Sequence, residues 1–174
     1  MYVEAPTNIA LTSDVPSIFL AGTIDNGDSF DWQKNISIRL FNEFKNDVDI
    51  LNPRRAMWGD LSEESLTEQI NWELTYLQHC DVVFMYITST SKSPISLLEL
   101  GTLLNRVEKN NQKLIVCCEP GFYRYTNVVT TFSFFSEKNN QHNNFFFTDY
   151  EKAVEKLTAL LQQKVIRQQH TGAI

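Results

Sequence analysis

Two short apolar runs constrain most strongly what this chain can fold into: DVVFMYI at 81–87 and KLIVCC at 113–118. Each run has the length of one strand and lacks the alternation of apolar and polar residues that marks a half-exposed strand. Strands that are apolar on both faces are typical of a parallel sheet covered by helices. The two runs therefore predict an α/β fold.

Helical patterns between strand-like runs extend this prediction to one domain with a parallel sheet flanked by helices. Further strands are expected at 17–21 and 48–51. Helices are expected at 31–45, at 63–79, from the motif SPISLLELG at 93–101 to about 109, and at 149–164. The domain is expected over 17–164, after an N-terminal arm at 1–16 and before a C-terminal tail at 165–174.

The segment 130–147 does not follow this alternation of strands and helices. It carries two groups of phenylalanines around a polar, asparagine-rich turn. We interpret it as a hairpin or an irregular flap. It either covers the core as an edge ribbon or presents aromatic surface to another subunit.

Charge and composition narrow the class of partner. A net charge of −6 disfavours nonspecific binding to nucleic acid, which needs a basic surface. No apolar run is long enough to span a membrane and no signal peptide precedes the domain, so we expect a cytoplasmic protein without membrane contact. The cysteines lack metal-ligand spacing, and neither GxGxxG nor GxxxxGK[ST] occurs. A small-molecule partner, without a metal or cofactor, is expected.

Three polar loops follow predicted strands: GTIDNG, NPRR and ITSTSKSPIS. In a parallel sheet such loops converge at the edge where ligands bind. Gly22 permits a ligand to approach the backbone, while Thr23 and Asp25 offer groups that suit sugar hydroxyls. An ordinary Asp-Asn-Gly turn explains the same residues.

Glu73 lies beside an expected core stripe on the helix at 63–79. Helical spacing places Leu66, Ile70, Leu74 and Leu77 on one face, with Glu73 near its edge. Burial of an unpartnered carboxylate is costly, so Glu73 either reaches a polar pocket or caps another group. Gln69, one turn earlier, could share that surface.

Glu99 also has two interpretations. Ser96 and Glu99 fit a capping box, in which both side chains bond to main-chain amides at a helix start. A carboxylate in the first turn of a helix is also kept ionised by the helix dipole, as a nucleophile needs. Ser93 and Pro94 would shape the loop that presents it, and neighbouring leucines would keep it dry.

Together these segments resemble the nucleoside 2-deoxyribosyltransferase family. The order and spacing of several motifs carry the resemblance more than any single motif. The motifs are IFLAGTIDNGDSFDWQ at 18–33, ILNPRR at 50–55, QINWELTYLQHCDVVFMYI at 69–87, SPISLLELG at 93–101 and GFYRYTNV at 121–128.

The resemblance implies a flavodoxin-like parallel α/β fold and transfer of 2-deoxyribose between nucleobases, with nucleosides and free nucleobases as partners. It implies that Glu99 is the nucleophile, which forms a covalent glycosyl intermediate, and that Glu73 positions the base or transfers a proton. Asn127 matches a position that a neighbouring subunit contributes in members of the family. That match implies a homo-oligomer.

Some residues depart from the family pattern or have open roles. Compact members often carry an aspartate six residues before the nucleophile, where this chain has Ser93, so proton handling at the base is open. Trp32 and Trp58 could stack on a base, although core packing also explains Trp32. Arg54 and Arg55 could bind a phosphate if nucleotides were substrates.

Two other functions fit the same residues. Water in place of a second base would make the protein a hydrolase of nucleosides or nucleoside monophosphates. A pocket without turnover would make it a nucleotide-sensing module.

Overall fold

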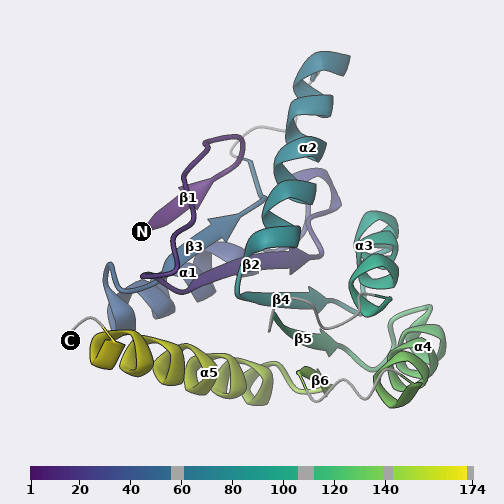
Figure 1. Ribbon diagram of the computed structural model, residues 1–174. Helices are drawn as coiled ribbons and strands as arrows, with labels where there is room; N and C mark the ends of the chain where they lie inside the picture. Colours follow the sequence, from purple (N-terminus) through teal and green to yellow (C-terminus); the bar gives the residue numbers. More distant parts are fainter. Residues whose placement is uncertain (56–60, 106–111, 139–142, 172–174) are drawn as a thin grey trace.

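The predicted α/β fold is confirmed. The computed structural model describes residues 1–55, 61–105, 112–138 and 143–171, in which six strands form one parallel sheet with helices on both faces (Figure 1). The sheet order is β1-β3-β2-β4-β5-β6, and without β1 it is the order of flavodoxin-like proteins. The strands are β1 Tyr2–Glu4, β2 Ser17–Gly22, β3 Asp49–Asn52, β4 Val82–Ile87, β5 Lys113–Cys118 and β6 Asn144–Phe147.

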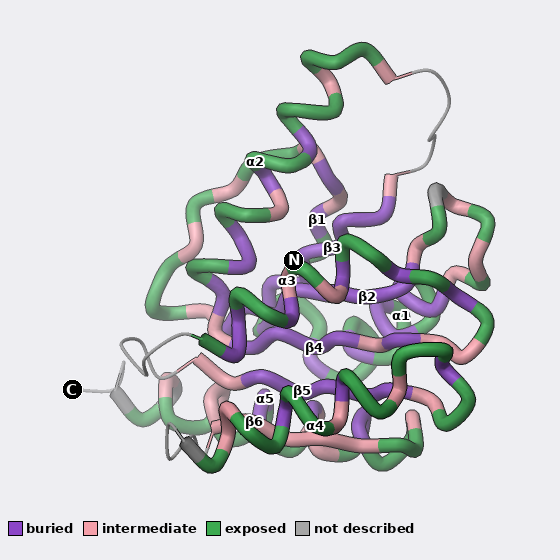
Figure 2. The backbone as a smooth tube through the Cα atoms, turned by 90° about the vertical axis from the view of Figure 1, so that its right-hand side faces the viewer, coloured by how far each residue is buried: buried purple, intermediate pink, exposed green. Residues whose placement is uncertain are grey.

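The helices form two layers, one on each face of the sheet. In chain order they are α1 Trp32–Phe44, α2 Glu63–His79, α3 Pro94–Leu104, α4 Tyr125–Lys138 and α5 Tyr150–Thr171. One apolar core lies between the sheet and α2, α3 and α4, and a second lies between the sheet and α1 and α5. The central strands are buried on both faces (Figure 2), as the apolar runs predict.

The N-terminal arm contains a strand that was not predicted. β1 pairs with β3 at the edge of the sheet, with Tyr2 opposite Ile50. The N-terminal ammonium of Met1 lies 3.0 Å from a carboxylate oxygen of Asp49, and Val3 is buried in the core. The prediction that the first strand begins at residue 17 is therefore wrong, because three residues are too few to give a periodic pattern.

The described residues of the segment 130–147 form neither a hairpin nor a flap, and residues 139–142 lie outside the described ones. The first part of the segment belongs to the helix α4, and Asn144–Phe147 forms a strand, which pairs with β5. Val128 and Phe132 lie one turn apart on α4 and are both buried in the core, and Phe132 packs on Phe146. The β-branched and aromatic residues of α4 favour a strand locally, but this packing makes the segment helical.

The remaining boundaries agree with the predictions to within a few residues, with two exceptions. The last helix continues past the predicted boundary at 164 as far as Thr171, so the described part of the tail is helical. The helix expected to reach about 109 ends at Leu104, and residues 106–111 lie outside the described ones. None of the described helices combines the length and the apolar character that crossing a membrane requires.

Candidate active site

A cleft of about 390 Å³ opens where β2 and β3 end, beside the start of α3. The sheet order places β3 on one side of β2 and β4 on the other, which makes this edge a switch point of the kind where α/β proteins bind ligands. The cleft brings together five residues predicted for the site. They are Gly22, Asp25, Glu73, Ser93 and Glu99.

Gly22 has a backbone conformation that a larger residue would not tolerate. Its φ angle is +127°, and a Cβ atom there would lie 2.0 Å from the carbonyl oxygen of Tyr86. The close approach lets the amide of Thr23 donate to that same carbonyl oxygen at 2.9 Å. Gly22 therefore fixes the chain where it leaves β2 and enters the loop that lines the cleft.

Three buried hydroxyl groups join the loops that follow β2 and β4. The oxygens of Thr23, Ser91 and Ser93 form a triangle with sides of 2.8, 2.8 and 3.0 Å. Thr23 is fully buried, so it does not offer its hydroxyl to the cleft; instead it positions Ser93, which lines the cleft. Ser93 is the N-cap of α3 in a left-handed conformation and makes no capping bond with its side chain.

Glu73 is held by a hydrogen bond from the previous turn of α2. The Nε2 atom of Gln69 donates to Glu73 Oε1 at 2.7 Å and to the carbonyl oxygen of Pro53 at 2.8 Å. Burial raises the pKa of Glu73, while the bond from Gln69 and the positive charge of Arg55 act in the opposite direction. Glu73 thus faces the cleft from a fixed position.

The stripe predicted to form the core face of α2 is correct only at Leu77, which is buried in the core. Leu66, Ile70 and Leu74 are 46%, 44% and 46% exposed, and Trp72 and Tyr76 pack on the sheet in their place. Because α2 is rotated in this way, Leu66 and Ile70 line the cleft. Sequence periodicity did not identify them as site residues, because aromatic residues and leucines compete for the core on this helix.

Glu99 is the sixth residue of α3, which begins at Pro94. The predicted capping box is wrong, because Ser93 rather than Ser96 is the N-cap and the first turn contains no acidic residue. The expectation that the helix start keeps Glu99 ionised is also wrong. Burial, and after it the negative charge of Glu73, raises the pKa of Glu99 to about 8.

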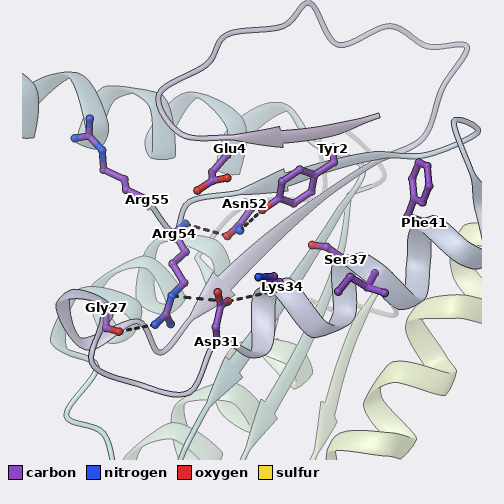
Figure 3. Close-up of a pocket in the computed structure, with 11 residues that line it drawn as sticks. Tyr2, Glu4, Gly27, Asp31, Lys34, Ser37, Phe41, Asn52, Arg54 and Arg55 are labelled. Atoms are coloured by element: carbon purple, nitrogen blue, oxygen red, sulfur yellow. Dashed lines mark hydrogen bonds and ion pairs between the residues drawn. The ribbon is translucent and has the colours of Figure 1, made fainter. Parts of the chain in front are cut away.

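Two further predicted residues hold the walls of the cleft without lining it. The indole nitrogen of Trp32 is buried and donates to the carbonyl oxygen of Thr23 at 2.9 Å. The guanidinium of Arg54 donates to the carbonyl oxygen of Gly27 at 2.6 Å (Figure 3) and to that of Ser29 at 2.7 Å. Both side chains stabilise the loop between β2 and α1.

The last predicted residues lie elsewhere. Asn127 is exposed near the start of α4 and is not part of the cleft of its own chain. Trp58 lies outside the described residues. Sequence reasoning missed Pro53 and Ile95, which line the cleft from the loop after β3 and from the first turn of α3.

Two carboxyl groups that share an apolar-walled cleft can divide the work of a displacement reaction. One can attack as an anion while the other carries a proton, provided that the two do not ionise together. The influence of Glu73 on the pKa of Glu99 meets this condition. The described residues contain no cluster of His, Cys, Asp and Glu that could hold a metal ion.

Comparison with known proteins identifies the family of the chain. Residues 15–122 match the family described as nucleoside 2-deoxyribosyltransferase like. The match includes β2, α2, β4 and α3, and with them all the residues that line the cleft. No curated protein matches the chain. Because the match covers more than half of the sequence, the chain belongs to the nucleoside 2-deoxyribosyltransferase-like family.

Proposed function

We propose that this protein moves 2-deoxyribose from one nucleobase to another, with Glu99 as the nucleophile. The observation that carries the proposal is the pairing of Glu99 with Glu73 in one partly apolar cleft. Retaining glycosyl transfer needs a carboxylate that attacks the anomeric carbon and a group that handles the proton of the leaving base. Family membership supports the sugar and the kind of leaving group.

In the first displacement, a carboxylate oxygen of Glu99 bonds to C1′ of the sugar. The bond between C1′ and the base nitrogen breaks, its electron pair stays with the base, and Glu73 donates a proton to the base. In the second displacement, a nitrogen of the incoming base attacks C1′, the ester oxygen leaves as the carboxylate of Glu99, and Glu73 takes back a proton. Two inversions give overall retention.

We place the starting proton of the pair on Glu99. Gln69 and Arg55 favour the charge on Glu73, and this charge favours the proton on Glu99 in the empty cleft. As positive charge builds up on the sugar next to Glu99, ionised Glu99 becomes favoured and the proton moves to Glu73 and on to the base. A single proton on the pair therefore serves the reaction.

Asp25 and Ser93 complete the proposed site. Asp25 is placed at the mouth of the cleft on the loop after β2, where its carboxylate can accept a hydrogen bond from a sugar hydroxyl. Ser93 stands at the start of α3 and can donate to or accept from the base, since a hydroxyl does both. Thr23, Trp32 and Arg54 act through the loops that they hold in place.

We also propose that a second subunit covers the cleft and supplies Asn127. Leu66, Ile70 and Leu74 of α2 are about half exposed, and Ile95 and Leu98 of α3 are 60% and 67% exposed. These apolar side chains lie on the two helices that flank the cleft, and such clusters mark interaction surfaces. Asn127 is exposed and free to reach another chain.

Product analysis tests the proposed transfer. The protein is incubated with a deoxynucleoside, with and without a second free base, and the products are separated by chromatography. The proposal predicts a new deoxynucleoside that forms only when the second base is present. Free sugar that accumulates at the same rate with and without the second base would indicate a hydrolase instead, and binding without any release of base would indicate a sensing module.

A further inference from the structure

A second cavity, of about 670 Å³, lies between β1 and α1, next to the loop that precedes α1. Its upper wall is formed by Tyr2 and Glu4 of β1, and its lower wall by Lys34, Ser37 and Phe41 of α1 (Figure 3). We call this cavity the β1–α1 groove. It does not share a lining residue with the cleft that holds Glu99.

The groove exists because the edge strand β1 extends the sheet beyond the layer formed by α1 and α5. Val3 packs into the core on the face of α2, so Tyr2 and Glu4 point to the opposite face. On that face the core residues come from the other strands and from α1 and α5, and none comes from β1. Among the described residues, β1 therefore lacks a helix over one of its faces.

The walls offer both apolar contact and an unpaired polar group. Ile38 and Phe41 are 52% and 44% exposed, although both lie on a helix whose other side is packed in the core. Tyr2 presents a second aromatic ring from β1. The hydroxyl of Ser37 is buried and has no hydrogen-bond partner among the described residues. A pocket with these properties suits a small organic ligand.

The charges that remain available in the groove are mainly positive. Arg54 is occupied by main-chain carbonyl oxygens, and Asp31 accepts from the amide of Lys34 and lies 3.7 Å from Arg54. The ion pairs of the described residues leave the ammonium of Lys34 without a partner. Lys45 adds a cation 5.7 Å from the ring of Phe41. Glu4 is the carboxylate that opposes them.

We propose that the β1–α1 groove is a second binding site, for a small aromatic anion. The ring of the ligand lies between Tyr2 and Phe41, and its anionic group meets the ammonium of Lys34. Aryl phosphates and aryl carboxylates share this chemistry. The ring contributes apolar area that a free anion lacks, and the anion contributes an ion pair that a neutral ring lacks.

The groove and the catalytic cleft have a common wall. Asn52 and Arg54 line the groove, whereas Pro53 between them lines the cleft and accepts the hydrogen bond of Gln69. Arg54 also holds the loop that carries Asp25 into the cleft. A ligand in the groove thus contacts the segment that positions the groups around Glu73 without entering the cleft.

Calorimetric titration of the full chain with phenyl phosphate tests this site, because the probe has no glycosidic bond and is not turned over. Inorganic phosphate and benzyl alcohol serve as fragments that lack the ring or the charge. We expect phenyl phosphate to bind at least about tenfold more tightly than either fragment, since it makes both contacts. Equal affinity for phenyl phosphate and one of the fragments would overturn the proposal, as would no binding at about 10 mM probe.

Surface variants locate the bound probe. Lys34→Ala and Phe41→Ala are each expected to weaken phenyl phosphate about tenfold or more. Lys152→Ala and Phe134→Ala change exposed residues of the same types on α5 and α4, and they should leave the affinity unchanged. Binding that survives both groove substitutions would place the probe elsewhere and refute the assignment.

Discussion

Glu73 and Glu99 stand on different helices, and the charge of one raises the pKa of the other. Gln69 holds the Glu73 carboxylate and the main chain of Pro53 at the same time, so the position of Glu73 is tied to the loop after β3. The pair is therefore built into the scaffold before any substrate arrives. The two carboxyl groups can therefore have different roles in the reaction, and substitution of each should affect the reaction differently.

Glu73→Gln should slow the reaction by a factor that depends on which base leaves. With ordinary deoxynucleosides, kcat should fall by about 10²–10⁴-fold, because the base must leave without a proton from Glu73. With 7-methyl-2′-deoxyguanosine, whose base is already cationic, the variant should release the base in the first displacement at nearly the rate of the parent protein. Single-turnover measurements of base release with both substrates measure the difference.

Glu99→Ala is the matched control, since it should abolish turnover of both substrates. An equal loss in Glu73→Gln with both substrates would contradict a role in proton transfer. It would leave Glu73 as a residue that only positions the base.

Glu99→Gln should stabilise the fold, and more so at higher pH. The pKa of Glu99 is raised in the folded protein from an ordinary value of 4.5 to about 8. The folded state therefore holds its proton more tightly than the unfolded state, and this contribution to stability is lost as pH rises from about 4.5 to 8. At pH 8 the glutamine variant should gain about 4 kcal/mol, or about 10 °C in Tm, over the parent protein.

Thermal unfolding at pH 5 and pH 8 measures this gain. Glu155→Gln makes the same change of charge at an exposed position on α5 and controls for the net charge of the protein. A gain in Tm that is the same at both pH values would show that ionisation of Glu99 is not the cause.

Gly22→Ala should be strongly destabilising. The new Cβ would lie 2.0 Å from the carbonyl oxygen of Tyr86, which belongs to the main chain of the strand that pairs with Gly22 and cannot move aside easily. We expect a loss of about 3 kcal/mol or more in the free energy of unfolding, measured by urea titration. Gly101→Ala is the control, because its Cβ meets no atom within 4 Å and a helix favours alanine. Equal stability of the two variants would refute the close approach at Gly22.

Much of the fold could be predicted because the buried strands have an unambiguous pattern. The strand at 113–118 and the helix at 63–79 have the predicted bounds. The predictions of secondary structure failed where the local sequence favours one structure and tertiary packing stabilises another. α4 is rich in residues that favour strands, and it is helical because Val128 and Phe132 pack on the sheet. β1 is stable because it pairs with β3, and a strand of three residues has no readable pattern.

The candidate site was predicted in its composition but not in its electrostatics. The loops after the parallel strands do converge, and they bring Gly22, Ser93 and Glu99 together as the sheet topology requires. The start of α3 at Pro94 was not apparent, and this start moves Glu99 out of the first turn. Its raised pKa comes from burial and from Glu73 on another helix, and neither can be read from local sequence.

Mixing two inactive variants tests the contribution of Asn127. If Asn127 completes the site of a neighbouring chain, Glu99→Ala and Asn127→Ala subunits should regain activity when they are dissociated and reassembled together. Hybrid assemblies would contain a site with both residues intact, so recovery of up to about a quarter of the parent activity is expected for random dimers. Light scattering gives the oligomeric state in parallel. A monomer, or a mixture that stays inactive, would contradict a shared site.

Mass spectrometry of the protein mixed with a deoxynucleoside and no acceptor base tests the central claim most directly. We predict a deoxyribosyl adduct on the peptide that carries Glu99, which disappears when a free base is added and never forms in Glu99→Ala. An adduct on Glu73, or steady release of base without any adduct under rapid quenching, would contradict Glu99 as the nucleophile.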